Sequence, residues 1–138
     1  MFPFSALSAS RYLWRGWPHE KGERLMTSLL DADGTEVMVV LVTAPSSEKA
    51  AEIARALVEE RLAACGTILE GARSIYRWEG QVQDEREALL IVKSSRDRLQ
   101  ALVDRIGILH PYEVPEIMGL SVAGGSRRYL DWIAESTR

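Results

Sequence analysis

The sequence has few of the residues from which metal centres and disulfide scaffolds are usually built. Among its 138 residues there is one cysteine, Cys65, so no disulfide can form within the chain. A single thiol also favours a reducing compartment such as the cytoplasm. One cysteine and two histidines, His19 and His110, cannot build a zinc site of the usual Cys/His spacing within one chain. Any metal site must therefore use carboxylates or residues that repeat across subunits.

Other absences exclude several classes of function. No apolar run approaches the roughly 18 residues that a membrane-spanning helix needs, and the longest one, 37–42, has the length of a strand. The formal net charge is −3 and no basic patch with interleaved aromatics occurs, which argues against a nucleic-acid partner. There is no glycine-rich phosphate loop, and no serine is paired with a histidine. We therefore expect neither a membrane protein nor an enzyme.

The composition that is present fits one globular domain preceded by an extension. Apolar residues make up 46% and charged residues 27%, which is enough for a core. Residues 1–35 differ from the rest because they hold several aromatics without a clean period, and we expect this extension to be flexible or dispensable. Three interpretations of it stay open: a leader before a start at Met26, a targeting peptide free of acidic residues up to Glu20, or a tail that contacts a neighbouring subunit.

The remaining residues, 36–138, predict an alternation of strands and helices. The predicted strands cover 36–43, 65–78 with a bend at 70–71, a return strand that ends in the apolar run 88–92, and 116–122. Glu79 and Gly80 form a suitable tight turn between the second and third strands. Ser46 is placed to cap a first helix, Ser94 or Ser95 a second, and a last helix covers 127–135.

This order, βαββαβ followed by a helix, is that of the ferredoxin-like α+β fold. Two right-handed βαβ units give an antiparallel four-stranded sheet with both helices on one face. The other face is then uncovered, and the long hairpin exposes its edges beyond the sheet. Association would solve both problems, so we expect an oligomer.

Several segments in register resemble CutA proteins. They are 40–45, 54–65, 74–80, the most specific one Leu109-His110-Pro111-Tyr112-Glu113-Val114-Pro115-Glu116-Ile117, and 129–132. The resemblance spans about residues 37–137 and implies a ferredoxin-like fold, a homotrimer with a PII-like architecture, and a link to divalent-cation (copper) tolerance. It implies no established catalytic reaction.

Two departures from the family pattern matter. Gly66-Thr67 follows Cys65 where many members have Asn-Ile or a similar pair. The cysteines that some members carry near the first strand and in the second helix are absent from 41–43 and 104–106. A copper site built on several thiolates is therefore not expected.

The candidate metal ligands are His110, Glu113 and Cys65. Imidazole and carboxylate suit Cu(II) or another borderline divalent cation, and a thiolate suits copper. Pro111 holds the first two on a rigid loop. The structural alternatives are that His110 caps a helix, that Tyr112 fills a gap between subunits, and that Cys65 is a small buried residue.

A further group of residues is predicted to line a cleft between subunits, where aromatic residues are enriched. They are Tyr76, Trp78, Glu79, Lys93, Tyr112, Glu116 and Trp132. The first hypothesis is a trimer that binds divalent cations weakly at these clefts. The rival is a PII-like sensor or adaptor that takes a small anionic ligand or an unknown protein partner, in which Lys93 and Arg77 would matter more than His110.

Overall fold

The structure, a computed structural model, describes residues 35–138 and has an α+β architecture. Residues 1–34 of the predicted extension lie outside the described part of the chain. The elements are β1 (Val37–Ala44), α3 (Ser47–Glu59), β2 (Cys65–Trp78), β3 (Gln81–Ser95), a 3-10 turn (Arg96–Arg98), α4 (Leu99–Leu109), β4 (Ile117–Ser121) and α5 (Arg127–Ser136).

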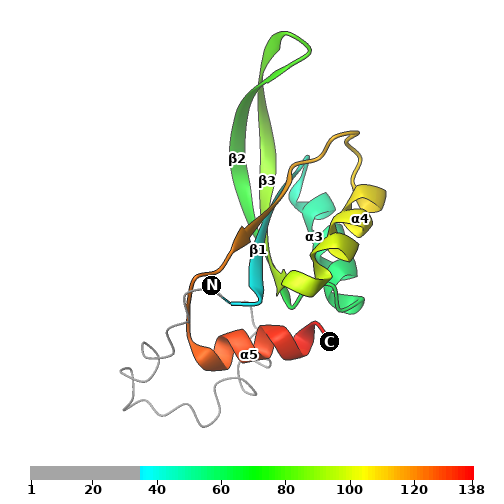
Figure 1. Ribbon diagram of the computed structural model, residues 1–138. Helices are drawn as coiled ribbons and strands as arrows, with labels where there is room; N and C mark the ends of the chain where they lie inside the picture. The colour runs from blue at the N-terminus through cyan, green and yellow to red at the C-terminus, as the bar shows by residue number, and fades with distance from the viewer. Residues whose placement is uncertain (1–34) are drawn as a thin grey trace.

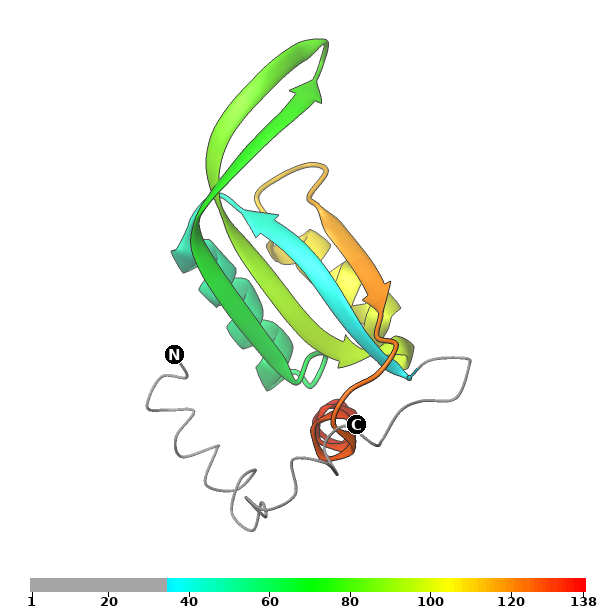
Figure 2. The same ribbon diagram turned by 90° about the vertical axis from the view of Figure 1, so that its left-hand side faces the viewer.

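The four strands form one antiparallel sheet in the order β2-β3-β1-β4. Helices α3 and α4 lie side by side on one face of it (Figure 1), and Figure 2 looks onto the opposite face. This arrangement confirms the ferredoxin-like prediction of both helices on one face. The hydrophobic core lies between the sheet and these helices, and its residues alternate along the strands as the pleat requires. Its largest fully buried side chains are Ile53, Leu57, Leu90, Leu102 and Ile106.

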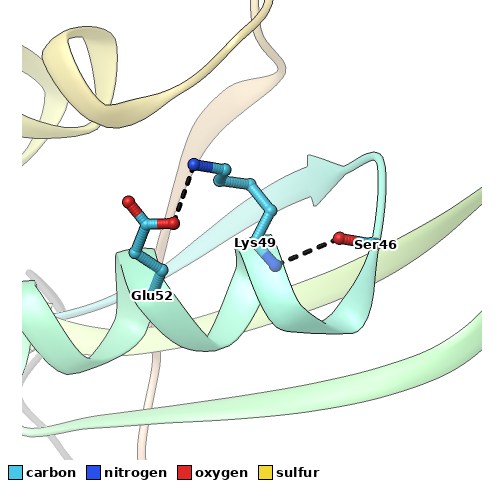
Figure 3. Close-up of polar contacts among 3 residues, drawn as sticks. All are labelled: Ser46, Lys49 and Glu52. Carbon is cyan, nitrogen blue, oxygen red and sulfur yellow. Dashed lines mark hydrogen bonds and ion pairs between the residues drawn. The ribbon is translucent and has the colours of Figure 1, made fainter.

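Helix α3 begins where the sequence places its cap. The Ser46 hydroxyl accepts a hydrogen bond of 3.1 Å from the Lys49 amide, and the Lys49 ammonium lies 2.7 Å from a Glu52 carboxylate oxygen (Figure 3). The first bond satisfies one of the amides that a helix start leaves unpaired. It fixes the direction in which the chain leaves β1.

The second predicted cap is right in position and wrong in its bond. Ser94 and Ser95 are the last residues of β3, and Ser95 occupies the N-cap position of the 3-10 turn that leads into α4, but neither side chain makes a capping bond. The Ser94 hydroxyl donates instead to the Leu62 carbonyl, and the Ser95 hydroxyl bonds to that of Thr137, just after α5. The strand is longer than the apolar run because both serines are buried and hydrogen-bonded to other parts of the chain.

The β2–β3 hairpin extends well beyond the body of the sheet (Figure 1). The predicted bend is confirmed as a register shift between Leu69 and Ala72, with Gly71 at a φ of 77°. The hairpin closes through Glu79 and Gly80, whose φ values are 48° and 78°. Positive φ at both central residues is the geometry of a tight hairpin turn, which confirms that prediction.

The face of the sheet opposite α3 and α4 is only partly covered. At one end Ile133 of α5 packs against Val37 and Ala64. Beyond this end the strand alternation places a set of apolar residues on the surface, which we call the open face. It consists of Val39, Leu41, Leu69, Leu89, Ile91, Met118 and Leu120. Leu69, Met118 and Leu120 are 51%, 50% and 45% exposed.

Candidate functional site

A cleft of about 650 Å³ lies between the far half of the hairpin and the loop that joins α4 to β4. It is lined by Thr43, Ser74, Ile75, Tyr76, Trp78, Glu85, Glu87, Tyr112, Glu113, Val114 and Glu116. Its side chains are therefore aromatic, acidic and apolar, together with the aliphatic hydroxyls of Thr43 and Ser74, and none of them is lysine, arginine or histidine.

Two tyrosines hold two of the glutamates. Tyr76 donates its hydroxyl to a carboxylate oxygen of Glu85 at 2.9 Å, and Tyr112 donates to Glu87 at 3.1 Å. The bond to Glu85 is the main cause that raises the pKa of Tyr76. Burial, followed by the bond to Glu87, raises the pKa of Tyr112 to about 12. Both hydroxyls therefore stay protonated at neutral pH and act as donors to the carboxylates.

His110 lies beneath the cleft and positions its loop. Its side chain is buried, its Nε2 lies 2.7 Å from the Thr43 carbonyl oxygen, and its Nδ1 accepts the Tyr112 amide at 3.1 Å. A carbonyl can only accept and an amide can only donate, so these partners select the neutral tautomer with its proton on Nε2. Both ring nitrogens are thus engaged within the chain. The imidazole ties the loop that carries Tyr112 and Glu113 to the end of β1.

The cleft has an excess of negative charge. It is lined by four glutamates, Glu85, Glu87, Glu113 and Glu116. The ion pairs that the structure shows within residues 35–138 are Lys49–Glu52, Arg73–Asp84 and Arg105–Glu60, and none of them includes a glutamate of the cleft. Glu87 is only 8% exposed, and it accepts a hydrogen bond from a neutral tyrosine. A buried carboxylate without a cation is costly, so the cleft favours a positively charged ligand.

Cys65 lies at the other end of the sheet. In the sheet Cys65 lies opposite Lys93 of β3, and Lys93 lies opposite Val39 of β1. His110 bonds instead to Thr43, which is four residues further along β1 than Val39. That separation is roughly 13 Å along the strands. The Lys93 ammonium donates to the Thr67 hydroxyl at 2.8 Å and lies 3.7 Å from the Cys65 sulfur.

Within one chain the structure gathers part of the predicted site. Tyr76, Trp78, Tyr112, Glu113 and Glu116 all line the cleft. The other predicted residues do not: Glu79 is in the hairpin turn, Lys93 is beside Cys65, and Trp132 packs against Tyr129 with ring centroids 5.5 Å apart. Among residues 35–138, no group of three or more His, Cys, Asp or Glu side chains converges as a metal site.

Glu85 and Glu87 were not predicted as site residues. The hairpin register places Glu85 opposite Ser74 and Glu87 opposite Ala72, so both lie on the face that carries Tyr76. Their spacing of two residues on a strand after a tight turn was the available signal. It could be used only once the register past the bulge was known.

Comparison with known proteins agrees with this fold. A sequence model of the family described as CutA1 divalent ion tolerance protein matches residues 38–136. The divalent-cation tolerance protein CutA of Thermus thermophilus is 54% identical over 99 residues, which are 72% of this chain and 96% of that protein. A second relative, the chloroplastic protein CutA of Arabidopsis thaliana, is 44% identical over 101 residues, 73% of this chain and 56% of that protein.

A solved structure of a relative has the same fold. The divalent cation tolerance protein (Cut A1) from Thermus thermophilus superposes with a TM-score of 0.73 at 53% identity, covering 74% of this chain and 99% of that one. Among residues 35–138, no helix is both long enough and apolar enough to cross a membrane. The family model covers nearly the whole described domain, and more than half of the aligned residues are identical to those of one member. This chain therefore belongs to the CutA1 divalent ion tolerance family.

Proposed function

We propose that this protein acts in divalent-cation tolerance as a homotrimer that binds the cation, copper included, weakly at clefts between subunits. The observation that carries the proposal is the set of four glutamates in the cleft, none of which forms an ion pair with a cation of the described chain. Oxygen ligands of this kind suit divalent cations. The names of the relatives, which refer to divalent-cation tolerance, support the same role.

The trimer is supported by the surface around the cleft. The open face is continuous and apolar, and such surfaces on a folded domain usually mark an interface. Ile75 and Val114 at the cleft are 65% and 66% exposed. A neighbouring copy that packs beside these residues would turn a surface cleft into one between subunits, with both side chains still in its lining.

The predicted ligands differ in how ready they are to bind a metal. Glu113 lies in the cleft and makes no ion pair with the described residues. His110 stays a predicted ligand, but a metal there would have to displace the Thr43 carbonyl or the Tyr112 amide. Cys65 stays a predicted ligand only if a neighbouring subunit brings it to the cleft. We therefore assign the first contact with the metal to the glutamates and a positioning role to His110.

The charge of the cleft disfavours the rival, a PII-like sensor of a small anionic ligand. Arg77 donates to the Gly80 carbonyl in the hairpin turn at 3.3 Å, and Lys93 donates to Thr67. Neither lines the cleft, whose charged side chains are all acidic. An anion there would be repelled by groups that no cation of the lining offsets.

We further propose that the protein is not an enzyme and works in the cytoplasm. The family names describe tolerance and no reaction. The single cysteine supports a reducing compartment. The Arabidopsis relative is named chloroplastic, so members of the family can differ in compartment. Cell fractionation would measure the compartment of this chain directly.

The test is calorimetric titration of the full chain with Cu(II), in a buffer that does not chelate the metal. We expect Glu113→Gln to weaken Cu(II) binding by about tenfold, equivalent to ~1.4 kcal/mol. Glu59→Gln is the matched control because Glu59 is exposed on α3 and loses the same charge outside the cleft. Equal Cu(II) affinity in both variants and the native protein would refute the assignment of the metal to the cleft.

A further inference from the structure

We propose that the cleft also takes an organic cation, specifically an aliphatic diamine or polyamine. This inference rests on the proposed function in one respect, namely that the cleft is a ligand site. It goes beyond it by naming a second class of ligand whose chemistry matches the shape, the charge and the aromatic lining together.

The size of the cleft exceeds what a metal ion requires. Its volume of about 650 Å³ lies in the range of pockets that hold small organic molecules. A divalent cation, bound by its ligands at roughly 2.0–2.6 Å, needs several donors converging on one point. In residues 35–138, no three His, Cys, Asp or Glu side chains do so. The site is therefore larger and less focused than a dedicated metal cage.

The negative charges are distributed rather than concentrated. Glu85 and Glu87 come from β3, two residues apart and hence roughly 7 Å apart along the strand. Glu113 and Glu116 come from the α4–β4 loop, where Val114 and Pro115 separate them. A ligand with several positive charges along its length can pair with carboxylates on both elements at the same time.

The aromatic rings of the cleft suit an ammonium group. Trp78 and Tyr76 are 45% and 39% exposed and line the cleft from β2. The Tyr76 and Tyr112 hydroxyls are already bonded to Glu85 and Glu87, so these two side chains offer a ligand mainly their rings. Cations bind to aromatic faces, with Trp the strongest.

The remaining lining fits the methylenes between the charged groups. Ile75 and Val114 are the most exposed apolar residues of the cleft, at 65% and 66%. Burying them under an alkyl chain removes apolar surface from water on both partners. Acidic, aromatic and apolar contacts within one cleft thus suit an aliphatic amine in addition to a metal ion, which would use the carboxylates alone.

The carboxylate of Glu87 is the group in the cleft that an ammonium group would stabilise most. This carboxylate is 8% exposed, and its hydrogen-bond donor within the described chain is the neutral hydroxyl of Tyr112. Charge-assisted bonds from an ammonium group are roughly twice as strong as neutral ones. An amine that reaches Glu87 would therefore add a charged donor to the neutral one that Tyr112 supplies.

The experiment is calorimetric titration of the native oligomer with spermidine, putrescine and propylamine, and with succinate as the anion control. We expect binding to weaken in the order spermidine, putrescine, propylamine, and no heat from succinate. Glu85→Gln/Glu87→Gln and Trp78→Leu should each weaken spermidine binding by about tenfold or more. The control Glu59→Gln should leave it within about twofold. Circular dichroism of every variant verifies that it is folded.

The outcomes separate this inference from the proposed function. Cu(II) binding that depends on Glu113, with no binding of spermidine, overturns the inference and leaves the metal role intact. Spermidine binding that is lost in the double variant, with no Cu(II) binding, supports the inference and refutes the metal role. Spermidine binding that Glu59→Gln weakens as much as the double variant is non-specific charge attraction and overturns the inference. Failure of spermidine to bind because a second copy fills the cleft also overturns it.

Discussion

At the scale of single residues, two non-glycine residues of the described chain have a left-handed backbone. They are Glu79, in the hairpin turn, and Arg61, which follows α3 with a φ of 59°. Around Arg61 the Leu62 amide donates to the Leu57 carbonyl, and the Arg61 amide donates to that of Val58. These two bonds form a Schellman motif, whose left-handed position is usually glycine. Arg61 thus holds a conformation that a side chain with a β-carbon adopts at a cost.

Replacing this residue tests that cost. We expect Arg61→Gly to raise the free energy of unfolding by about 0.5–1 kcal/mol, because glycine removes the steric clash of the β-carbon in the left-handed region. Urea denaturation at a fixed protein concentration measures the change. Arg61→Ala is the control, since it removes the charge and keeps the β-carbon. A gain as large in Arg61→Ala would show that the charge, and not the backbone, is responsible.

At the scale of elements, local signals predicted most of the fold. Ser46 and the helical spacing placed α3 correctly, and Gly71 and Glu79-Gly80 marked the bulge and the turn of the hairpin. The end of β3 was predicted wrongly because the partners of Ser94 and Ser95 are distant in sequence. A serine that caps a helix and a serine that bonds to another element look the same in a sequence.

The contact between β2 and α3 depends on one small residue. A β-carbon added at Gly66 would lie 2.8 Å from the β-carbon of Ala54 and 3.2 Å from a methyl of Leu90. We expect Gly66→Ala to lower the free energy of unfolding by about 1–3 kcal/mol, because the packed helix has to move away from the sheet. Urea denaturation at fixed protein concentration measures this loss as well.

A second substitution shows whether the loss arises from this contact. Ala54→Gly removes the methyl that the new β-carbon meets, although glycine within a helix itself costs about 1 kcal/mol. The two changes together should therefore cost less than the sum of the two alone. Simple additivity of the two losses would mean that the clash with Ala54 is not the cause.

At the scale of the whole molecule, the site was the part that the sequence predicted least completely. Tyr112 and Glu113 stand out because the resemblance marks their segment, and both line the cleft. Glu85 and Glu87 carry no motif, and they face the same cleft only because the bulge and the turn set the register of the hairpin. Cys65 and His110 looked like partners by chemistry, yet the sheet holds them near opposite ends of β1.

The open face provides the test of the trimer, because it is an apolar surface of seven residues that α3 and α4 do not cover. Met118 is 50% exposed on β4, and Ile108 is 75% exposed on α4, which packs on the opposite face of the sheet. We expect the native protein to show three times the 15.4 kDa of one chain in light scattering. Met118→Glu should shift it toward the mass of one chain, since a charge buried at an interface without a partner is costly. Ile108→Glu, the same change on the helical side, should leave the mass unaltered. A native protein with the mass of one chain, or dissociation by Ile108→Glu alone, would show that the open face is not the subunit interface.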